Sequence, residues 1–221
     1  MGNGGRVQLQ RERELIAEFA RRLRPDGLVI GTAGNLSVRS GDLVAVTPSG
    51  LDYDELTPAT ICVVDLEGRV AQGRCRPSSE LPLHLQIYAR SDTAAVVHTH
   101  SPYATVLGTV VPELPPIHYL IADLGGRVRV APYATPGSQE LAVHLEVALA
   151  GRAAVLLANH GAITIAGSLV RAYSRSLLLE WLSALYYRAR VIGEPSLVGD
   201  EEVARVGRFL REYLGTDRDA P

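Results

Sequence analysis

The stretch Ala94-Ala95-Val96-Val97-His98-Thr99-His100 limits the possible folds of this chain more than any other. Its short apolar run predicts a buried strand, which ends at the two histidines. Because side chains alternate between the two faces of a strand, His98 and His100 project to the same side. Two imidazoles on one side of a stiff strand can bind a zinc ion, which asks for further protein ligands. On its own, however, such a pair is also common as an incidental polar edge.

A second apolar run, residues 153–158, ends in Asn159-His160-Gly161. His160 is therefore expected at the end of a buried strand, as are His98 and His100. Binding and catalytic residues are often found in the loops at such positions. Upstream of both runs, Glu80 offers a carboxylate. Glu80 and His160 are the candidates to complete a metal site with the two histidines of the first strand.

Helical and strand patterns alternate along the chain. Apolar residues at helical spacing predict helices at about 7–24, after 80, from 102, and at 138–149, 177–189 and 201–213. Apolar or alternating runs predict further strands at 28–30, 36–39, 43–46 and 128–130, and a hairpin that joins 61–65 to 67–70. No repeat or linker divides this pattern, so we expect one α/β domain over residues 1–221, with residues 1–6 disordered or loosely held.

The charged residues exclude several classes of function. The formal net charge of −2 shows no basic excess, which argues against a nucleic-acid or membrane-surface partner. No apolar run approaches the roughly 18 residues of a membrane span and no signal-peptide pattern is present, so we expect a cytoplasmic protein. The chain contains no Lys, which excludes Schiff-base formation with a ketone. If the protein forms a carbanion, a metal must stabilise the charge.

Three turns are rich in small and hydroxyl side chains: Gly31-Thr32-Ala33-Gly34-Asn35, Thr47-Pro48-Ser49-Gly50 and Pro77-Ser78-Ser79-Glu80. Glycines allow close backbone approach to an anion, and Asn35 adds an amide donor. Ser78 or Ser79 can cap the helix that follows, and a helix N-terminus also suits phosphate. Such turns are more often plain connections, and their spacing fits neither a Walker loop nor the dinucleotide-binding fingerprint.

Taken in order, six motifs resemble the class II aldolase/adducin family. They are the three turns above, His98-Thr99-His100, Ile117-His118-Tyr119 and Asn159-His160-Gly161. The resemblance runs from the first helix to Tyr213. It implies a three-layer α/β/α sandwich around a central, mostly antiparallel mixed sheet, and a homotetramer with active sites between subunits.

The resemblance also implies a role for each matching residue. The zinc ligands that it implies are His98, His100, His160 and Glu80. Glu80 also matches the catalytic acid/base, Tyr119 matches a tyrosine that gives a proton to the aldehyde half, and Tyr213 matches a second active-site tyrosine. The substrate phosphate is expected against Gly34, Asn35, Ser49, Gly50, Ser78 and Ser79.

The activity implied is that of a zinc-dependent aldolase. Such an enzyme reversibly cleaves a ketose 1-phosphate, similar to L-fuculose 1-phosphate, to dihydroxyacetone phosphate and an aldehyde. Elementary chemistry agrees, because breaking a C–C bond beside a ketone leaves an enediolate, whose charge Zn²⁺ can stabilise as a Lewis acid. A carboxylate beside the metal, such as Glu80, can exchange a proton with the enediolate carbon, and the phosphate orients the substrate.

The resemblance also leaves open other enzymes that share this fold. Pentulose-phosphate 4-epimerase, methylthioribulose-1-phosphate dehydratase and sugar-acid phosphate decarboxylase are alternatives, although the epimerases carry Asp where this chain has Glu80. A non-catalytic adducin-like interaction module lacks the metal ligands that are present here. Leu81 and Asn159 stand where the sugar aldolases have Trp and His, so we expect a different aldehyde pocket.

The other three histidines have no assigned role. His84 and His144 fall on expected helices, and we expect both to be surface or capping residues. His118 neighbours Tyr119, and in an extended segment its side chain would face away from that ring.

Overall fold

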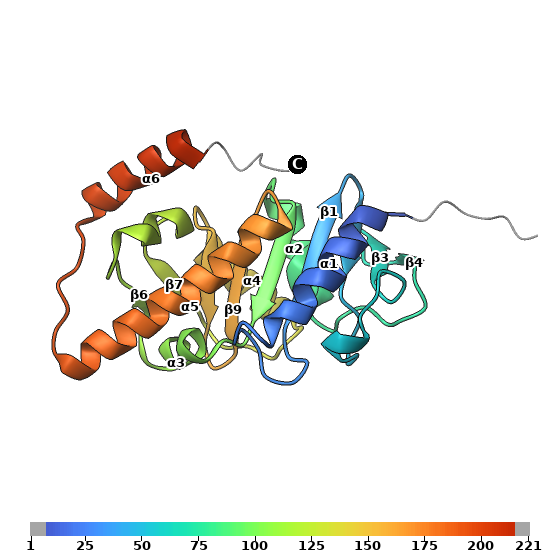
Figure 1. The fold of residues 1–221 in the computed structure, drawn as a ribbon, viewed down its shortest axis with the longest axis horizontal. Helices are drawn as coiled ribbons and strands as arrows, with labels where there is room; N and C mark the ends of the chain where they lie inside the picture. Colours follow the sequence, from blue (N-terminus) through green and yellow to red (C-terminus); the bar gives the residue numbers. More distant parts are fainter. Residues whose placement is uncertain (1–7, 215–221) are drawn as a thin grey trace, which may run out of the picture.

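One sheet collects the apolar runs of the sequence (Figure 1). The structure, a computed structural model, describes the backbone of residues 8–214 and the side chains of residues 8–212. Within this range, nine strands lie in the order β4-β3-β2-β1-β5-β9-β8-β7-β6. The strands are β1 (Asn35–Ser40), β2 (Leu43–Val46), β3 (Cys62–Asp65), β4 (Val70–Gln72), β5 (Ala95–Thr99), β6 (Glu113–Leu114), β7 (Val128–Ala131), β8 (Ala154–Leu157) and β9 (Gly161–Ala166).

The sheet is mixed but mostly antiparallel. Strands β7 and β8 are parallel, whereas the other neighbouring pairs are antiparallel. The expected sheet type is therefore confirmed, as is the hairpin of β3 and β4. The segment 1–6, which we expected to be loosely held, lies outside the described residues.

Helices cover both faces of the sheet, which gives three layers. The helices are α1 (Gln10–Leu23), α2 (Leu81–Arg90), α3 (Pro102–Val110), α4 (Gln139–Leu149), α5 (Leu169–Ile192) and α6 (Asp200–Leu214), with short 3₁₀ helices η1 (Tyr53–Glu55) and η2 (Tyr119–Leu124). Helices α1 and α5 cross the nearer face in Figure 1, and α2 and α4 cover the opposite face. Helix α6 packs against η2 at the periphery. In the described range, no helix is long and apolar enough to span a membrane.

Strand β5 shows why the sheet is buried on both faces. Ala95 and Val97 pack into the core under α1 and α5, whereas Val96 packs into the core under α2 and α4. All three side chains are fully buried, as a continuous apolar run requires. The same alternation turns His98 toward the α2 face, because it follows Val96 by two residues.

Residues 28–30, which we expected to form a strand, instead close the end of α1. The N–H of Leu28 donates to the carbonyl of Leu23 (2.9 Å) and the N–H of Gly27 to that of Arg24 (3.1 Å). With Gly27 at φ 73°, this is a Schellman motif, in which an apolar residue after the glycine packs back on the helix. Leu28 is therefore buried because it closes the helix, and the expected strand at residues 28–30 is wrong.

Candidate metal centre and active site

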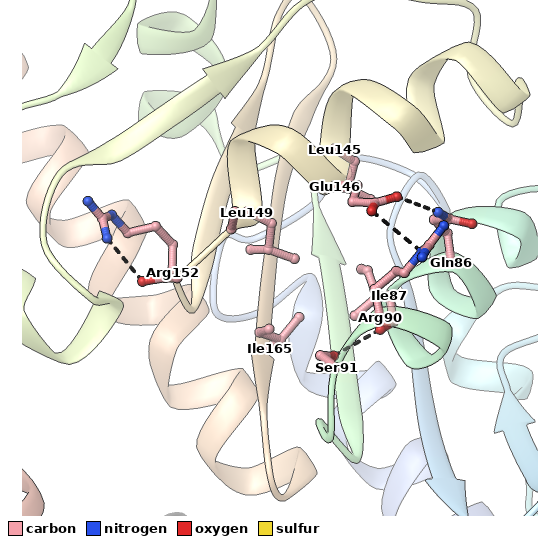
Figure 2. A pocket seen from close by; sticks show the side chains of 11 residues that line it. Gln86, Ile87, Arg90, Ser91, Leu145, Glu146, Leu149, Arg152 and Ile165 are labelled. Carbon is pink, nitrogen blue, oxygen red and sulfur yellow. Dashed lines mark hydrogen bonds and ion pairs between the residues drawn. The ribbon is translucent and has the colours of Figure 1, made fainter.

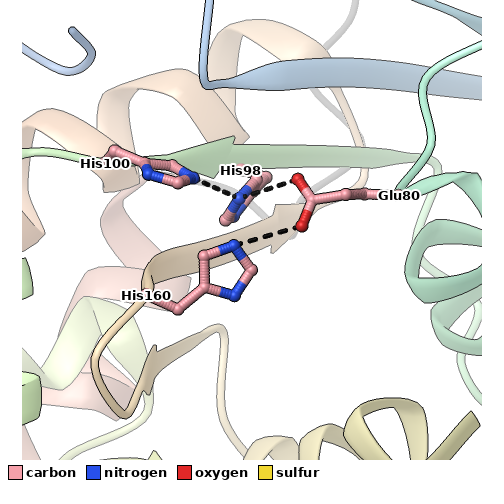
Figure 3. A group of neighbouring side chains, drawn as sticks. All are labelled: Glu80, His98, His100 and His160. Atoms are coloured by element: carbon pink, nitrogen blue, oxygen red, sulfur yellow. Dashed lines mark hydrogen bonds and ion pairs between the residues drawn. The ribbon is translucent and has the colours of Figure 1, made fainter. Parts of the chain in front are cut away.

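Four side chains from distant parts of the chain converge at one point (Figure 3). Glu80, His98, His100 and His160 each offer one ligand atom, and these atoms all lie within 4.8 Å of one another. The Nε2 atoms of His98 and His100 are 2.9 Å apart. Glu80 Oε2 lies 3.1 Å from His98 Nε2, and Glu80 Oε1 lies 3.1 Å from His160 Nε2.

Sheet order brings these residues together. His98 lies in β5 and His100 directly after it, so both point to the same side as expected. Strand β9 pairs antiparallel with β5, with Thr99 opposite Ala162, so the start of β9 lies beside the end of β5. His160 immediately precedes β9. Glu80 is the N-cap residue of α2, which covers this face of the sheet.

The turn that carries His160 has little space. A Cβ atom on Gly161 would overlap the carbonyl oxygen of Thr99 in the neighbouring strand, so only glycine fits there. Asn159 has φ 54°, in the left-handed region that Asn tolerates better than most residues. The departure from the family pattern at this position therefore suits the backbone of the turn.

The converging nitrogen and oxygen atoms require a proton or a metal cation among them. His98 Nδ1 lies 3.0 Å from the carbonyl oxygen of Ala162, which can only accept, so Nδ1 carries a proton. In a neutral ring, Nε2 is then a bare lone pair that faces the Glu80 carboxylate and His100 Nε2. Acceptors in such contact repel unless a proton or a metal cation lies among them. Three imidazole nitrogens and a carboxylate oxygen form a donor set that suits zinc.

The charge states of the ligands also favour metal binding. Burial alone would raise the pKa of Glu80, but the electrostatic effect of His98 and the contacts with His160, His98 and Asn35 outweigh burial. The pKa of Glu80 therefore lies well below its usual range, and the side chain is an anion at neutral pH. Burial, together with the electrostatic effect of the neighbouring His98 and His160, lowers the pKa of His100 to about 4. His100 is thus neutral, which is the form that binds a metal.

The three hydroxyl-rich turns lie side by side next to this cluster. The second and third turns are joined by a bridge between Pro48 and Pro77, and Ser78 N–H donates to the Thr47 carbonyl (3.1 Å). The first turn joins them because Leu36 N–H donates to Thr47 Oγ1 (3.2 Å). The fold therefore brings together the residues expected to bind phosphate, namely Gly34, Asn35, Ser49, Gly50, Ser78 and Ser79. Their role as phosphate ligands stays a prediction.

Two details of these turns differ from expectation or were missed. Helix α2 has no side-chain cap, and the Ser78 hydroxyl instead accepts from the N–H of Glu80 (3.2 Å), so the expected serine cap is wrong. Tyr53 holds the first turn, because its hydroxyl accepts from Gly34 N–H (2.9 Å) and donates to the Gly34 carbonyl (2.8 Å). A Cβ on Gly34 would lie 2.8 Å from the carbonyl oxygen of His98.

The two expected active-site tyrosines do not join the cluster within the described part of this chain. Tyr119 opens η2 and is 48% exposed. Its ring centroid lies 4.4 Å from that of His118, so the expectation that His118 faces away from it is wrong; the segment turns into a 3₁₀ helix at this point. Tyr213 lies in the last turn of α6, and its side chain is outside the described residues.

His84 is the main residue that the sequence interpretation missed. Its side chain is fully buried, so the expected surface position is wrong. It contacts Asn35 and Ser37 of β1 (2.6 Å each). A signal was present, because His84 precedes Ile87 and Tyr88 by three and four residues and so belongs to the buried stripe of the helix.

A separate pocket lies between α2 and α4 (Figure 2). It has a volume of about 310 Å³, and none of the four clustered residues lines it. At its rim Glu146 accepts from Gln86 (2.7 Å) and pairs with Arg90 (3.4 Å). Gln86, Arg90 and Glu146 therefore satisfy one another at this rim.

Comparisons with known proteins agree with this geometry. The model of the class II aldolase and adducin N-terminal domain matches residues 14–187. A 5-deoxy-D-ribulose 1-phosphate aldolase from Bacillus thuringiensis serovar kurstaki is 41% identical over 208 residues, which cover 93% of this chain and 98% of that protein. A 5-methylthioribulose-1-phosphate/5-deoxyribulose-1-phosphate aldolase from Rhodospirillum rubrum is 41% identical over 212 residues, 95% of this chain and 94% of that one. A solved L-fuculose 1-phosphate aldolase matches with a TM-score of 0.90 and 39% identity, over 94% of this chain and 100% of that chain.

Proposed function

Because the chain belongs to the class II aldolase and adducin family, we propose that it is a zinc-dependent aldolase that acts on a ketose 1-phosphate. The products of cleavage are dihydroxyacetone phosphate and an aldehyde, and the reaction is reversible. The observation that carries this proposal is the convergence of three histidines and Glu80 within 4.8 Å. An adducin-like module without catalysis would not need such a donor set.

In this proposal the three histidines bind the metal, and Glu80 transfers the proton. His98, His100 and His160 would hold the zinc ion. The chemistry that bound zinc supplies is Lewis-acid stabilisation of the negative charge left when a C–C bond beside a ketone breaks. Glu80, an anion next to that position, takes or returns the proton at the reacting carbon. Glu80 is positioned for this task by the start of α2 and by the hydrogen bond that Asn35 of β1 donates to its carboxylate.

The remaining expected residues bind and protonate the substrate. Ser49 and Ser79 are exposed, and Ser79 directly precedes Glu80, so a phosphate bound at these turns would fix the reacting carbons relative to the acid/base. Tyr119 would exchange a proton with the oxygen of the aldehyde half. Tyr119 is exposed, and the ring contact described for it is with His118 and not with the four clustered residues, so we propose that it serves a neighbouring subunit of a homotetramer. The same proposal covers Tyr213, and a cytoplasmic location stays a prediction.

An aldol-cleavage assay on a panel of ketose 1-phosphates tests the function. The panel should contain L-fuculose 1-phosphate, 5-deoxyribulose 1-phosphate and 5-methylthioribulose 1-phosphate, because similar proteins are named for these substrates. We expect release of dihydroxyacetone phosphate that is lost on chelation and restored by zinc. A zinc-loaded protein that dehydrates, epimerises or decarboxylates its substrates without cleaving them would contradict the proposal.

The Glu80→Gln variant isolates the acid/base. We expect kcat to fall by about 10²- to 10⁴-fold, the usual share of general acid–base catalysis. Zinc content, measured by elemental analysis, should stay near that of the wild type because three histidines remain. Glu146→Gln is the matched control, since Glu146 pairs with Arg90 at the surface and should be dispensable. Unimpaired turnover of Glu80→Gln would contradict the role given to Glu80.

A further inference from the structure

A chain of hydrogen bonds runs behind Glu80 through the buried interface of β1 and α2. Asn35 Nδ2 donates to Glu80 Oε2 (2.8 Å), and Asn35 Oδ1 lies 2.6 Å from His84 Nε2. On the other side of the ring, His84 Nδ1 lies 2.6 Å from Ser37 Oγ, which lies 2.7 Å from the Tyr88 hydroxyl. All five side chains are less than 10% exposed.

The spacing of the residues explains why these side chains meet. Asn35 and Ser37 are two residues apart, so both project from the same face of β1. Glu80, His84 and Tyr88 follow one another at intervals of four, so they lie along one face of α2. The two polar rows interdigitate between the strand and the helix. Buried polar side chains need partners, and this chain of hydrogen bonds gives one to each of Asn35, Ser37, His84 and Tyr88.

The donors and acceptors allow one direction for the protons. A carboxylate oxygen of Glu80 accepts from the NH₂ group of Asn35, so the oxygen of the Asn35 amide faces His84. That oxygen only accepts, so His84 Nε2 carries the proton. Burial lowers the pKa of His84 to about 3, so the ring is neutral and Nδ1 accepts from Ser37. Ser37 has a single proton to give, and Tyr88 must therefore donate to Ser37.

We propose that His84 is a positioning residue for Glu80, and that it acts by fixing the orientation of the Asn35 amide. Ser37 and Tyr88 select the His84 tautomer that this task requires. Without a donor at His84 Nε2, the Asn35 amide can rotate by half a turn and direct its oxygen at the carboxylate. The two acceptors then repel each other, and Glu80 loses its place beside the reacting carbon. The catalytic part of this inference rests on the proposed function.

The tautomer of His84 gives a test that is independent of activity. In the zinc-loaded protein labelled with ¹⁵N-histidine, a long-range ¹H–¹⁵N correlation spectrum reports which ring nitrogen carries the proton. The His84 signals are assigned by their disappearance in His84→Gln. We expect a protonated Nε2 and a bare Nδ1. A protonated Nδ1 with a bare Nε2 would overturn the proposal, whatever the activity of the enzyme.

Kinetics test the positioning role. His84→Phe keeps a ring in the cavity but removes the donor, and kcat should fall about 10- to 100-fold, as for other residues that orient a catalytic group. KM and zinc content should change little. His84→Gln can again donate an N–H to Asn35, and it should recover most of the lost kcat. A purely structural role would instead lower the melting temperature in both variants and leave kcat per folded molecule unchanged.

Ser37→Ala keeps the test decisive if His84→Phe does not fold. It removes the donor to His84 Nδ1, so we expect a several-fold lower kcat and a mixture of His84 tautomers. Ser176→Ala is the matched control, since Ser176 is equally buried but bonds to Thr164 and the Ala172 carbonyl. Equal kcat for the two serine variants would contradict the proposal. A wild-type protein that cleaves no substrate would contradict the proposed function instead, and the tautomer spectrum would still decide the hydrogen-bond chain.

Discussion

At the scale of single residues, the proposed metal centre depends on how closely two strands approach. Gly161 lies where β9 begins, directly after His160, and its Cα faces the carbonyl of Thr99 in β5. Any side chain there forces β5 and β9 apart. Because His98 lies in β5 and His100 directly after it, whereas His160 lies in the turn before β9, such a movement separates the candidate ligands.

The Gly161→Ala variant should show both effects. We expect the free energy of unfolding to fall by about 1–3 kcal/mol, the usual cost of overpacking, and zinc to be bound more weakly. Urea denaturation and competition with a chelator measure the two quantities. Gly193→Ala serves as the control, since a Cβ there meets no atom within 4 Å and the backbone is extended at φ 171°. Equal stability of the two variants would show that the strands have room to adjust.

At the scale of elements, one carboxylate ties α5 to the start of α3. Glu180 accepts from the N–H of Tyr103 and from that of Ala104, both at 2.9 Å. The N-cap residue of α3, Ser101, makes no side-chain cap, so Glu180 takes over this task from another helix. Its charge also interacts favourably with the N-terminal end of the helix dipole. Helix α3 begins two residues after His100, so this contact supports the exit of the ligand strand.

Glu180→Gln should therefore destabilise the protein more than an ordinary surface change. The amide keeps one acceptor but turns an NH₂ group toward a backbone donor, and we expect a loss of about 1–2 kcal/mol in the free energy of unfolding. Glu202→Gln removes a carboxylate that pairs with Arg205 at the surface (2.6 Å), and it should change the free energy of unfolding much less, because exposed ion pairs contribute little. Urea denaturation of both variants makes the comparison. A cost for Glu180→Gln no larger than that of the control would refute the capping role.

At the scale of the whole molecule, exposed aromatic side chains mark a surface that a second subunit could cover. Trp181 on α5 is 47% exposed and Tyr119 at η2 is 48% exposed. The His118 ring lies between them, with centroids 5.0 Å and 4.4 Å away. Large aromatic side chains are enriched in the buried centres of interfaces. The proposed homotetramer would bury this group and bring Tyr119 to a neighbouring metal centre.

Light scattering coupled to size-exclusion chromatography tests the assembly. We expect the wild type to have about four times the 23.8 kDa mass of one chain. Trp181→Glu should form smaller species and lose most activity, because burying an unpaired charge in an interface is energetically unfavourable. Val147→Glu changes a more exposed apolar residue on α4 (70%) and is the comparison. A wild type that is a monomer at micromolar concentration would rule out the tetramer.

Local patterns of the sequence were sufficient for several features of the site. The two-residue period of a strand places His98 and His100 on one side, and the apolar run before them ensures that this strand is buried. The three hydroxyl-rich turns are visible as small and polar residues between apolar runs. Two predictions were wrong because the same residue pattern can have two structural causes. Leu28 is apolar because it closes a helix, and His84 is polar on a buried stripe because polar residues face it.

Only the tertiary structure decides which of these local features meet. The order β1-β5-β9 puts His160 beside His98, and the placement of α2 over that face brings in Glu80. Neither contact can be read from residues that are near in sequence, since pairing of distant strands depends on the balance of the whole core. For the same reason, the sequence showed His84 as a histidine on a helix. Its partners Asn35 and Ser37 lie more than 40 residues away in the chain, and folding alone turns them toward it.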